Sequence, residues 1–540
     1  MKSYKIKIKS IAITGTIAFL LAQASCTRDF ENINKNPLNP DKEMEQMDGV
    51  LNGAYMPTLQ KNVIPVGAAS DATNYVNKYQ IVVNLAGDGW AGYMSPRDNK
   101  FNAGQNFTTG FFIQSWVNNS FSWRITDVFA PWIQLKNINT AGTNPNKEMF
   151  ALAQITKIAA LHRTTDMFGP IPYSKVGSGS FKVEYDSQED VYKSFFAELD
   201  EAIAVLADFL NRGNTTVPNA ADVLYNGDVR KWIKFANSLM LRLAIRVRFA
   251  DNNLAKQYAE KAVAHSVGLI DTQADIAKMA TGANLTMKNS LKVIKDEYND
   301  TRMGATIWCY LKGYNDPRVN VYFDNNGSKA VRIGIPSTAD LYESASKPIA
   351  GEYDPTYWMK ASEVFFLKAE GALAGYNMGA TPKYFYEQGI TMSFAENAQA
   401  IGSYLSNTSQ PAAYADPAST ALYSAGAPST VTVAWDDKDT EERKLEKIIT
   451  QKYLAIYPDG QEAWSEWRRT GYPRQVPPAV NYTNSGVILS DGYKNGIRRM
   501  PYPQSEYDQN TANVQSAVQK YLTGTDNAAT NLWWDKKPKN

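Results

Sequence analysis

The stretch Ser187-Gln-Glu-Asp-Val-Tyr-Lys-Ser-Phe-Phe-Ala-Glu-Leu-Asp-Glu-Ala-Ile-Ala-Val-Leu206 indicates most directly which class of fold the chain adopts. Its first four residues resemble a capping box, the pattern with which many helices begin. The apolar residues that follow recur every three or four positions, which places them on one face of a helix: Val191, Phe195, Leu199, Ala202 and Leu206. The stretch therefore predicts an amphipathic helix that packs through this face.

The same spacing recurs along much of the chain. Leu152, Ile155, Ala159 and His162 form one further apolar face, as do Trp232, Phe235, Leu239 and Leu243. More helices are expected over 118–140, 253–265, 360–375, 383–399 and 440–457. Helices paired by short loops predict a mainly α fold of tetratricopeptide-like hairpins, although no clean repeat is visible. Long loops and minor β elements would complete it.

The N-terminus has the features of an export signal. Lys2, Lys5, Lys7 and Lys9 precede an apolar run, Ile11 to Leu21, that is too short to span a bilayer. Small residues then lead to Cys26, whose thiol is placed to carry a lipid. We interpret residues 1–25 as a lipoprotein signal peptide, 26–42 as a lipidated tether and 43–540 as the binding domain. The alternative is an ordinary secretory signal, but the only other cysteine is Cys309, so no disulfide framework explains Cys26.

The composition excludes some functions and favours others. The 540 residues hold 56 Lys and Arg against 54 Asp and Glu, so no basic surface for nucleic acid is expected. The 12 Trp, 31 Tyr and 21 Phe favour recognition of sugars, peptides or proteins, because Tyr and Trp combine a flat apolar face with a polar edge.

Catalytic patterns are weak. Glu462 and Glu466, four residues apart beside Trp464 and Trp467, resemble the carboxylate pair of a glycosidase. A solvated or Arg-paired helix face, with Arg468 and Arg469 adjacent, is the simpler interpretation. The two histidines, His162 and His265, lie in predicted amphipathic helices, where packing is their expected role.

Metal and anion sites are equally unsupported by the sequence. Asp436, Asp437 and Asp439 lack the glycine and glutamate of a calcium loop, so we expect them to cap the helix that follows, and we expect no metal or cofactor. Arg242, Arg246 and Arg248 indicate either an anion site or a salt-bridged face, and we favour the second.

Candidate ligand-binding residues come from the long aromatic stretches 62–117 and 300–358, since loops of this length are often functional. In Gly87-Asp-Gly-Trp-Ala-Gly-Tyr93 the glycines are expected to free the backbone and expose Trp90 and Tyr93 beside Asp88. Asp71 lies upstream in the same predicted loop, and Trp308, Cys309 and Tyr310 form a second candidate group. Each ring has core packing as its alternative role.

Several segments, taken together, resemble the SusD-like (RagB/SusD) family of outer-membrane nutrient-binding lipoproteins. They run in the family's order along nearly the whole chain: Cys26-Thr-Arg-Asp-Phe-Glu-Asn-Ile-Asn-Lys-Asn-Pro37, Asp166-Met-Phe-Gly-Pro-Ile-Pro-Tyr173, Trp232 with Asn237-Ser-Leu-Met-Leu-Arg-Leu-Ala-Ile-Arg246, Asp316-Pro-Arg-Val319, Ser362-Glu-Val-Phe-Phe-Leu-Lys-Ala-Glu370, Glu462-Ala-Trp-Ser-Glu-Trp-Arg-Arg-Thr-Gly471 and Arg498-Arg-Met-Pro-Tyr-Pro503 with Glu506, Tyr507 and Asn510.

The resemblance implies a single helical domain with tetratricopeptide-like hairpins. It also implies a lipid-anchored protein on the outer membrane of a Gram-negative cell, which captures an oligosaccharide without catalysis and passes it to a SusC-like TonB-dependent transporter. A peptide ligand on the same scaffold, and a carboxylate-dependent glycosidase, are the alternatives. None of the matching segments names the ligand, so Asp71, Asp88, Trp90, Tyr93, Trp308, Cys309 and Tyr310 remain predictions from their chemistry alone.

Overall fold

The stretch that begins at Ser187 forms a helix in the computed structural model, as its spacing predicts. The helix, α8, spans Gln188–Asn211, and the Ser187 side chain accepts a hydrogen bond from the backbone N–H of Asp190 at 3.0 Å. The structure describes residues 50–68, 72–141, 145–180, 182–282, 286–336, 338–418, 421–487 and 495–539. Cys26 and Asp71, with the predicted signal peptide and tether, lie outside them.

Helices dominate the described residues, which confirms the expected mainly α class. The α-helices are α4 (Val50–Lys61), α5 (Ala72–Tyr79), α6 (Gln114–Thr140), α7 (Lys147–Phe168), α8, α9 (Val229–Val247), α10 (Asn252–Ala264), α11 (Ser290–Lys292), α12 (Ala305–Gly313), α13 (Val319–Tyr322), α14 (Ala361–Leu373), α15 (Pro382–Glu396), α16 (Glu441–Ile456), α17 (Gly460–Thr470), α18 (Gln504–Gln509) and α19 (Thr511–Tyr521).

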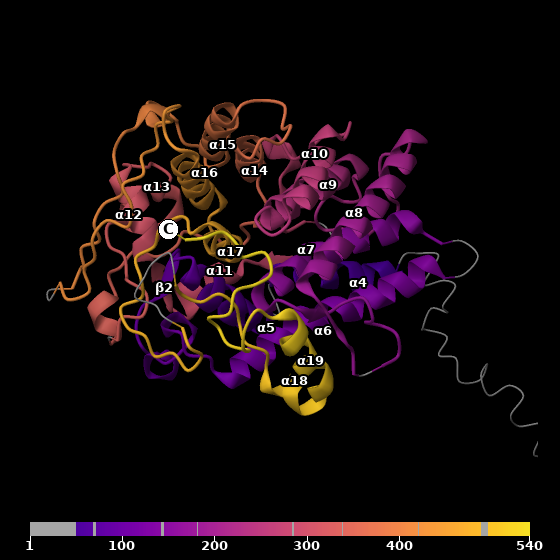
Figure 1. The fold of residues 1–540 in the computed structure, drawn as a ribbon, viewed down its shortest axis with the longest axis horizontal. Helices are drawn as coiled ribbons and strands as arrows, with labels where there is room; N and C mark the ends of the chain where they lie inside the picture. The colour runs from indigo at the N-terminus through magenta and orange to yellow at the C-terminus, as the bar shows by residue number, and fades with distance from the viewer. Residues whose placement is uncertain are drawn as a thin grey trace, which may run out of the picture. The chain divides into compact units, whose positions relative to one another are not determined.

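Neighbouring helices pack as hairpins. Helices α6 to α10 each contact the next along the chain and lie side by side in Figure 1. Helices α14 and α15 form another closely packed pair, and α16 packs on both. Side chains with helical spacing, such as Val191, Phe195 and Leu199, are fully buried between these helices. Burial of one apolar face per helix is therefore what assembles the scaffold.

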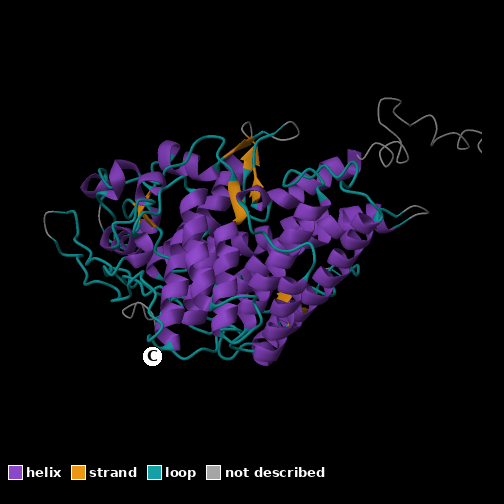
Figure 2. Cartoon of the chain, turned by 90° about the horizontal axis from the view of Figure 1, so that it is seen from above, coloured by secondary structure: helices purple, strands orange, loops and turns teal. Residues whose placement is uncertain are grey.

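The strands are short and pair two by two, as Figure 2 shows among the helices. The four antiparallel pairs of the described residues are β1 (Gly67–Ala68) with β6 (Met287–Lys288), β2 (Met94–Pro96) with β7 (Thr301–Met303), β3 (Ile171–Pro172) with β4 (Tyr185–Asp186), and β5 (Ala277–Met279) with β8 (Thr356–Met359). Strand β8 leads directly into α14, and this junction lies beside the cavity described below.

The expectation of long loops over 62–117 and 300–358 is only partly right. The first stretch contains α5 and a π-helix, Gln80–Asp88, and the second contains α12 and α13. The apolar residues Val82, Val83 and Leu85 explain the difference, because they bury the π-helix in the core. In the described part of the chain, no helix has the length and apolar character needed to cross a bilayer.

Candidate ligand-binding site

The prediction that residues 87–93 form an exposed loop is wrong. Asp88, Trp90 and Tyr93 are all buried. Asp88 ends the π-helix and accepts hydrogen bonds from the side chain of Asn84 and the backbone N–H of Gly460. Burial raises the pKa of the Asp88 carboxyl well above its ordinary value, against the smaller opposing effect of the Asn84 bond. A carboxyl held in this way has no open face for a ligand.

The glycines around Asp88 serve close packing rather than flexibility. A Cβ atom on Gly87 would lie 2.8 Å from the backbone nitrogen of Gln461, and one on Gly460 would lie 2.3 Å from Asp88 Oδ1. The π-helix and the start of α17 therefore touch backbone to backbone, which only glycine permits. Gly87, predicted to lie in an exposed loop, therefore lies at a buried junction.

The candidate rings belong to one aromatic core. Trp90 donates its indole N–H to the carbonyl of Phe107 at 3.0 Å, and its ring lies 4.5 Å from that of Trp464. Tyr93 stacks on Tyr453 at 4.5 Å and donates its hydroxyl to the carbonyl of the same residue. The alternative of core packing is therefore the one that the structure supports for both rings.

The second candidate group meets the first at Tyr453. The ring of Tyr310, on α12, lies 6.3 Å from that of Tyr453, and its hydroxyl donates to the carbonyl of Arg474 at 2.8 Å. Cys309 is buried, which raises the pKa of its thiol to about 12. Trp308 is half-buried against Tyr414. The structure thus brings the two predicted groups together, but as core.

The two glutamates considered for catalysis lie in a buried network of charges. Glu462 accepts from Arg246 at 2.5 Å and from Lys452 at 3.1 Å, and Glu466 pairs with Arg246 and Arg469. Burial raises the pKa of Glu466, but the charges of Arg469, Lys452 and Arg246 outweigh burial and lower this pKa to about 2. Both carboxylates are thus ionised counter-ions in the core, as the simpler interpretation of this helix predicted for Glu466 and Arg469.

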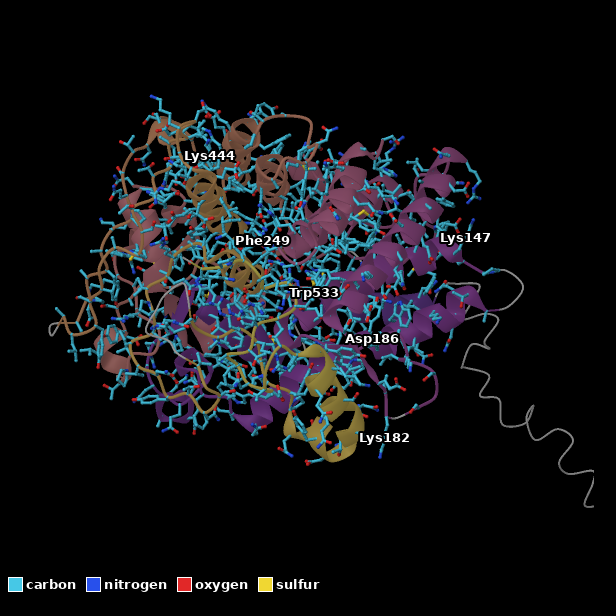
Figure 3. The ribbon with its side chains drawn as sticks, viewed as in Figure 1. Lys147, Lys182, Asp186, Phe249, Lys444 and Trp533 are labelled. Atoms are coloured by element: carbon cyan, nitrogen blue, oxygen red, sulfur yellow. The ribbon has the colours of Figure 1, made fainter. Side chains whose placement is uncertain are left out.

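The arginines of α9 extend this network, which confirms the expected salt-bridged face. Arg242 pairs with Glu363 at 2.6 Å, and Arg248 pairs with Glu370 at 2.9 Å. Phe249, labelled in Figure 3, lies under the guanidinium groups of Arg248 and Arg469, 4.5 and 5.6 Å from its ring centre. The network ties α9, α14 and α17 together at the centre of the fold.

The remaining sequence candidates have structural roles. His162 is buried, and its Nδ1 lies 3.1 Å from the carbonyl of Ile158. The cap of α16 is Thr440, not the predicted aspartates, and Asp439 instead pairs with Lys447 at 3.1 Å. Within the ranges that the structure describes, no group of three or more His, Cys, Asp or Glu residues is arranged to hold a metal ion.

A cavity of about 290 Å³ among the described residues offers a recess for a ligand. Its volume falls near the lower end of the range typical of small-molecule pockets. The residues that line it come from separate parts of the chain: Val63, Ile64, Tyr79, Val83, Arg124, Arg163, Asn289, Leu291, Val321, Tyr322, Ile349, Ala350, 354–357, Lys360, Asn397, 456–459 and Gln461. Sequence reasoning missed it because these segments come together only in the folded chain.

Charged and polar groups form the inner wall of the cavity. Arg163, from α7, donates from Nη1 and Nη2 to the two carboxylate oxygens of Asp459, at 2.8 and 2.6 Å. Arg124, from α6, donates from Nη2 to the side-chain oxygen of Gln461 at 2.6 Å. Lys360 donates to the carbonyl of Tyr457 at 2.7 Å, and its ammonium lies 5.0 Å from the ring centre of Tyr357. The wall thus offers donors beside aromatic faces.

The other end of the cavity reaches the surface. Ile349 is 45% exposed, and Asp354 is exposed as well. Tyr353, which precedes Asp354, is 53% exposed, and Tyr357 is half-buried in the wall. An exposed ring beside a polar cavity is the arrangement that suits a polyhydroxylated ligand, because one sugar face is apolar and its hydroxyls need hydrogen-bond partners.

The chain matches the family model described as "SusD-like: Susd and RagB outer membrane lipoprotein" over residues 32–535. Among solved structures, it is similar to a chitin-binding SusD homolog from Flavobacterium johnsoniae, with 36% identity and a TM-score of 0.83 over 90% of this chain and 99% of that one. SusD homologs from Bacteroides uniformis and Bacteroides thetaiotaomicron share 39% and 34% identity, with TM-scores of 0.81 and 0.79, each over 90% of this chain and 99% of theirs. No curated protein matches the chain.

Proposed function

Because this chain belongs to the SusD-like family of outer-membrane lipoproteins, we propose that it captures an oligosaccharide in the cavity beside Tyr353 and Tyr357 and delivers it to a partner TonB-dependent transporter. Members of the family are non-catalytic binding proteins. The family also places the protein at the outer membrane as a lipoprotein, which agrees with the predicted signal peptide.

The observation that carries this proposal is the make-up of the cavity. Its wall contains the cations of Arg163 and Lys360 and the half-buried ring of Tyr357, and the exposed Tyr353 directly precedes Asp354, which lines the cavity. The volume of about 290 Å³ suits one sugar unit of a chain better than a long segment. In this proposal, one unit enters the cavity while the rest of the oligosaccharide lies along the exposed segment 349–357.

Delivery and anchoring extend the proposal to parts of the chain that the structure does not describe. A lipid on Cys26, followed by the tether 26–42, would hold the domain 43–540 at the outer face of the membrane. A lasting complex with a transporter needs an interface of roughly 2,000 Å² or more. The similarity to a chitin-binding homolog makes oligosaccharides of amino sugars the first class to test.

Glycan arrays and peptide arrays probed with the lipidated chain in detergent test the proposal. We expect binding to oligosaccharides and a fall in affinity of about tenfold for Tyr353→Ala, since stacking on a sugar face is worth about 1 kcal/mol or more. The matched control is Tyr384→Ala, because Tyr384 is 50% exposed on α15 and, unlike Tyr353, has no neighbour in the chain that lines the cavity. Binding to peptides alone would keep the fold and replace the ligand class.

A further inference from the structure

Arg124 lines the cavity as a buried cation that has no counter-ion among the described residues. Its side chain is only 6% exposed. Its Nη2 donates to the carbonyl of Val82 at 3.3 Å and to Gln461, whereas Nε is buried without a partner. Among the described residues, no carboxylate lies within ion-pair distance of it. Arginines in protein interiors are normally paired, because removing an isolated charge from water costs several kcal/mol.

The other charges of the wall do not supply the missing counter-ion. Arg163 binds both carboxylate oxygens of Asp459. Asp459 therefore affects Arg124 only through a longer-range electrostatic interaction. Arg163 adds a second positive charge, and burial together with this charge lowers the pKa of Arg124 to about 9. Lys360, which is also buried, donates only to carbonyl oxygens in the part of the chain that is described.

Arg124 differs from the other buried arginines of the core. Arg246 and Arg469 are as deeply buried as Arg124, but each is paired with two glutamates. Arg468 has no ion pair among the described residues either, but its guanidinium donates to three carbonyl oxygens and to the hydroxyl of Ser465, and it does not line the cavity. Arg124 combines a buried Nε that has no partner with a place in the cavity wall. An absent counter-ion beside an open space is what a site for an anionic ligand group requires.

We infer that the inner end of the cavity is an anion subsite, in which Arg124, with Lys360 nearby, binds the carboxylate or sulfate of an acidic sugar. This inference rests on the proposed function and narrows its ligand class to acidic oligosaccharides. The guanidinium suits carboxylate and sulfate groups, because its N–H donors form charge-assisted hydrogen bonds with their oxygens. Aromatic rings at the open end would hold the sugar that carries the charge.

A first experiment tests the anion subsite without knowledge of the glycan. Thermal unfolding of the full lipidated chain is measured in sodium sulfate and in sodium chloride at equal ionic strength. Sulfate stabilises most proteins by exclusion from their surface, so the informative quantity is the difference between variants. We expect sulfate to raise the Tm of the natural chain more than that of Arg124→Met. Equal shifts in the two proteins would overturn the subsite. The control is Arg212→Met, since Arg212 is half exposed at the C-terminal end of α8 and does not line the cavity.

A second experiment tests the ligand class by calorimetry with matched pairs of oligosaccharides. One pair is a galacturonate tetrasaccharide and its methyl ester, and the other is a sulfated galactan tetrasaccharide and its desulfated form. We expect the charged member of at least one pair to bind about tenfold or more tightly, and the pair that responds separates carboxylate from sulfate. In Arg124→Met this preference should disappear, so that the charged and the neutral member bind with equal affinity, and a cooperative thermal unfolding transition shows that the variant is folded. Arg124→Lys should retain part of the preference.

The outcomes separate the inference from the function on which it rests. Equal affinity for charged and neutral members in the natural chain would overturn the acidic ligand class and leave oligosaccharide capture standing. If no glycan bound, but the rise in Tm caused by sulfate depended on Arg124, oligosaccharide capture would be overturned and the anion subsite would stand. A preference for charged glycans that survives in Arg124→Met and in Lys360→Met would place the anion elsewhere and overturn the assignment.

Discussion

Arg163 and Asp459 form a bidentate ion pair that joins the C-terminal part of α7 to the start of α17, with hydrogen bonds of 2.8 and 2.6 Å. Asp459 also caps α17, because it accepts from the backbone N–H of Glu462 at 3.2 Å. One carboxylate therefore fixes a helix start and a wall of the cavity together. The pair is nearly buried, with 4% of the Arg163 side chain and 12% of the Asp459 side chain exposed.

The substitution Asp459→Asn isolates the ion pair from the cap. Asparagine caps a helix about as well as aspartate, so the main loss is the charge that balances Arg163. We expect the free energy of unfolding to fall by about 3 kcal/mol, as for other buried pairs that lose one partner. Urea unfolding measures the change. Asp251→Asn, at the cap of α10, is the control and should change stability by less than about 0.5 kcal/mol. Equal effects at the two sites would contradict the account.

The buried network around Glu466 predicts loss of stability in acid. Folding holds the pKa of Glu466 at about 2 and that of Glu462 well below its ordinary value, because neighbouring cations outweigh burial. A carboxyl whose pKa is lower in the folded state stabilises the fold above its unfolded pKa, and this contribution is lost as the pH falls. The free energy of unfolding should therefore decrease from about pH 4.5 towards pH 2. Urea unfolding at several pH values tests this, and Glu466→Gln should show a shallower decrease. A natural chain with constant stability over this range would contradict the prediction.

The buried position of Trp90 predicts that its loss damages the fold. Trp90→Ala removes a ring packed on Trp464 and should lower the free energy of unfolding by about 3 to 5 kcal/mol. Tyr384→Ala, at an exposed ring, should stay within about 0.5 kcal/mol. Chemical unfolding of the two variants gives the comparison. If Trp90→Ala retained full stability and lost only glycan affinity, the prediction from the sequence that Trp90 binds the ligand would be supported.

The helices were predictable from the sequence because their apolar residues recur at helical spacing, as in Val191, Phe195 and Leu199. The cavity was not predictable from the sequence. Arg124, Lys360 and Asp459 lie far apart in the chain and are brought together only by helix packing. The prediction of an exposed loop over residues 87–93 was wrong for a related reason. Glycine is compatible both with an exposed flexible loop and with close backbone contact, and only the packed position of Gln461 distinguishes them.

High pH should weaken the binding of acidic ligands through Arg124. Burial and the charge of Arg163 lower the pKa of its guanidinium to about 9, so the cation persists at neutral pH and is lost as the pH rises through this value. Affinity for an acidic oligosaccharide should fall between about pH 8 and pH 10, whereas affinity for its neutral counterpart should change less. Calorimetry across this range measures both. A parallel decline for the two ligands would show that Arg124 does not govern the effect.

Calorimetric titration of the lipidated chain with neutral and acidic oligosaccharides and with mixed peptides, followed by product analysis of the same samples, tests the central claim most directly. The account predicts that an oligosaccharide binds, is recovered uncleaved, and binds more weakly to Tyr353→Ala than to the natural chain. Binding of peptides alone, or cleavage of any bound oligosaccharide, would contradict it.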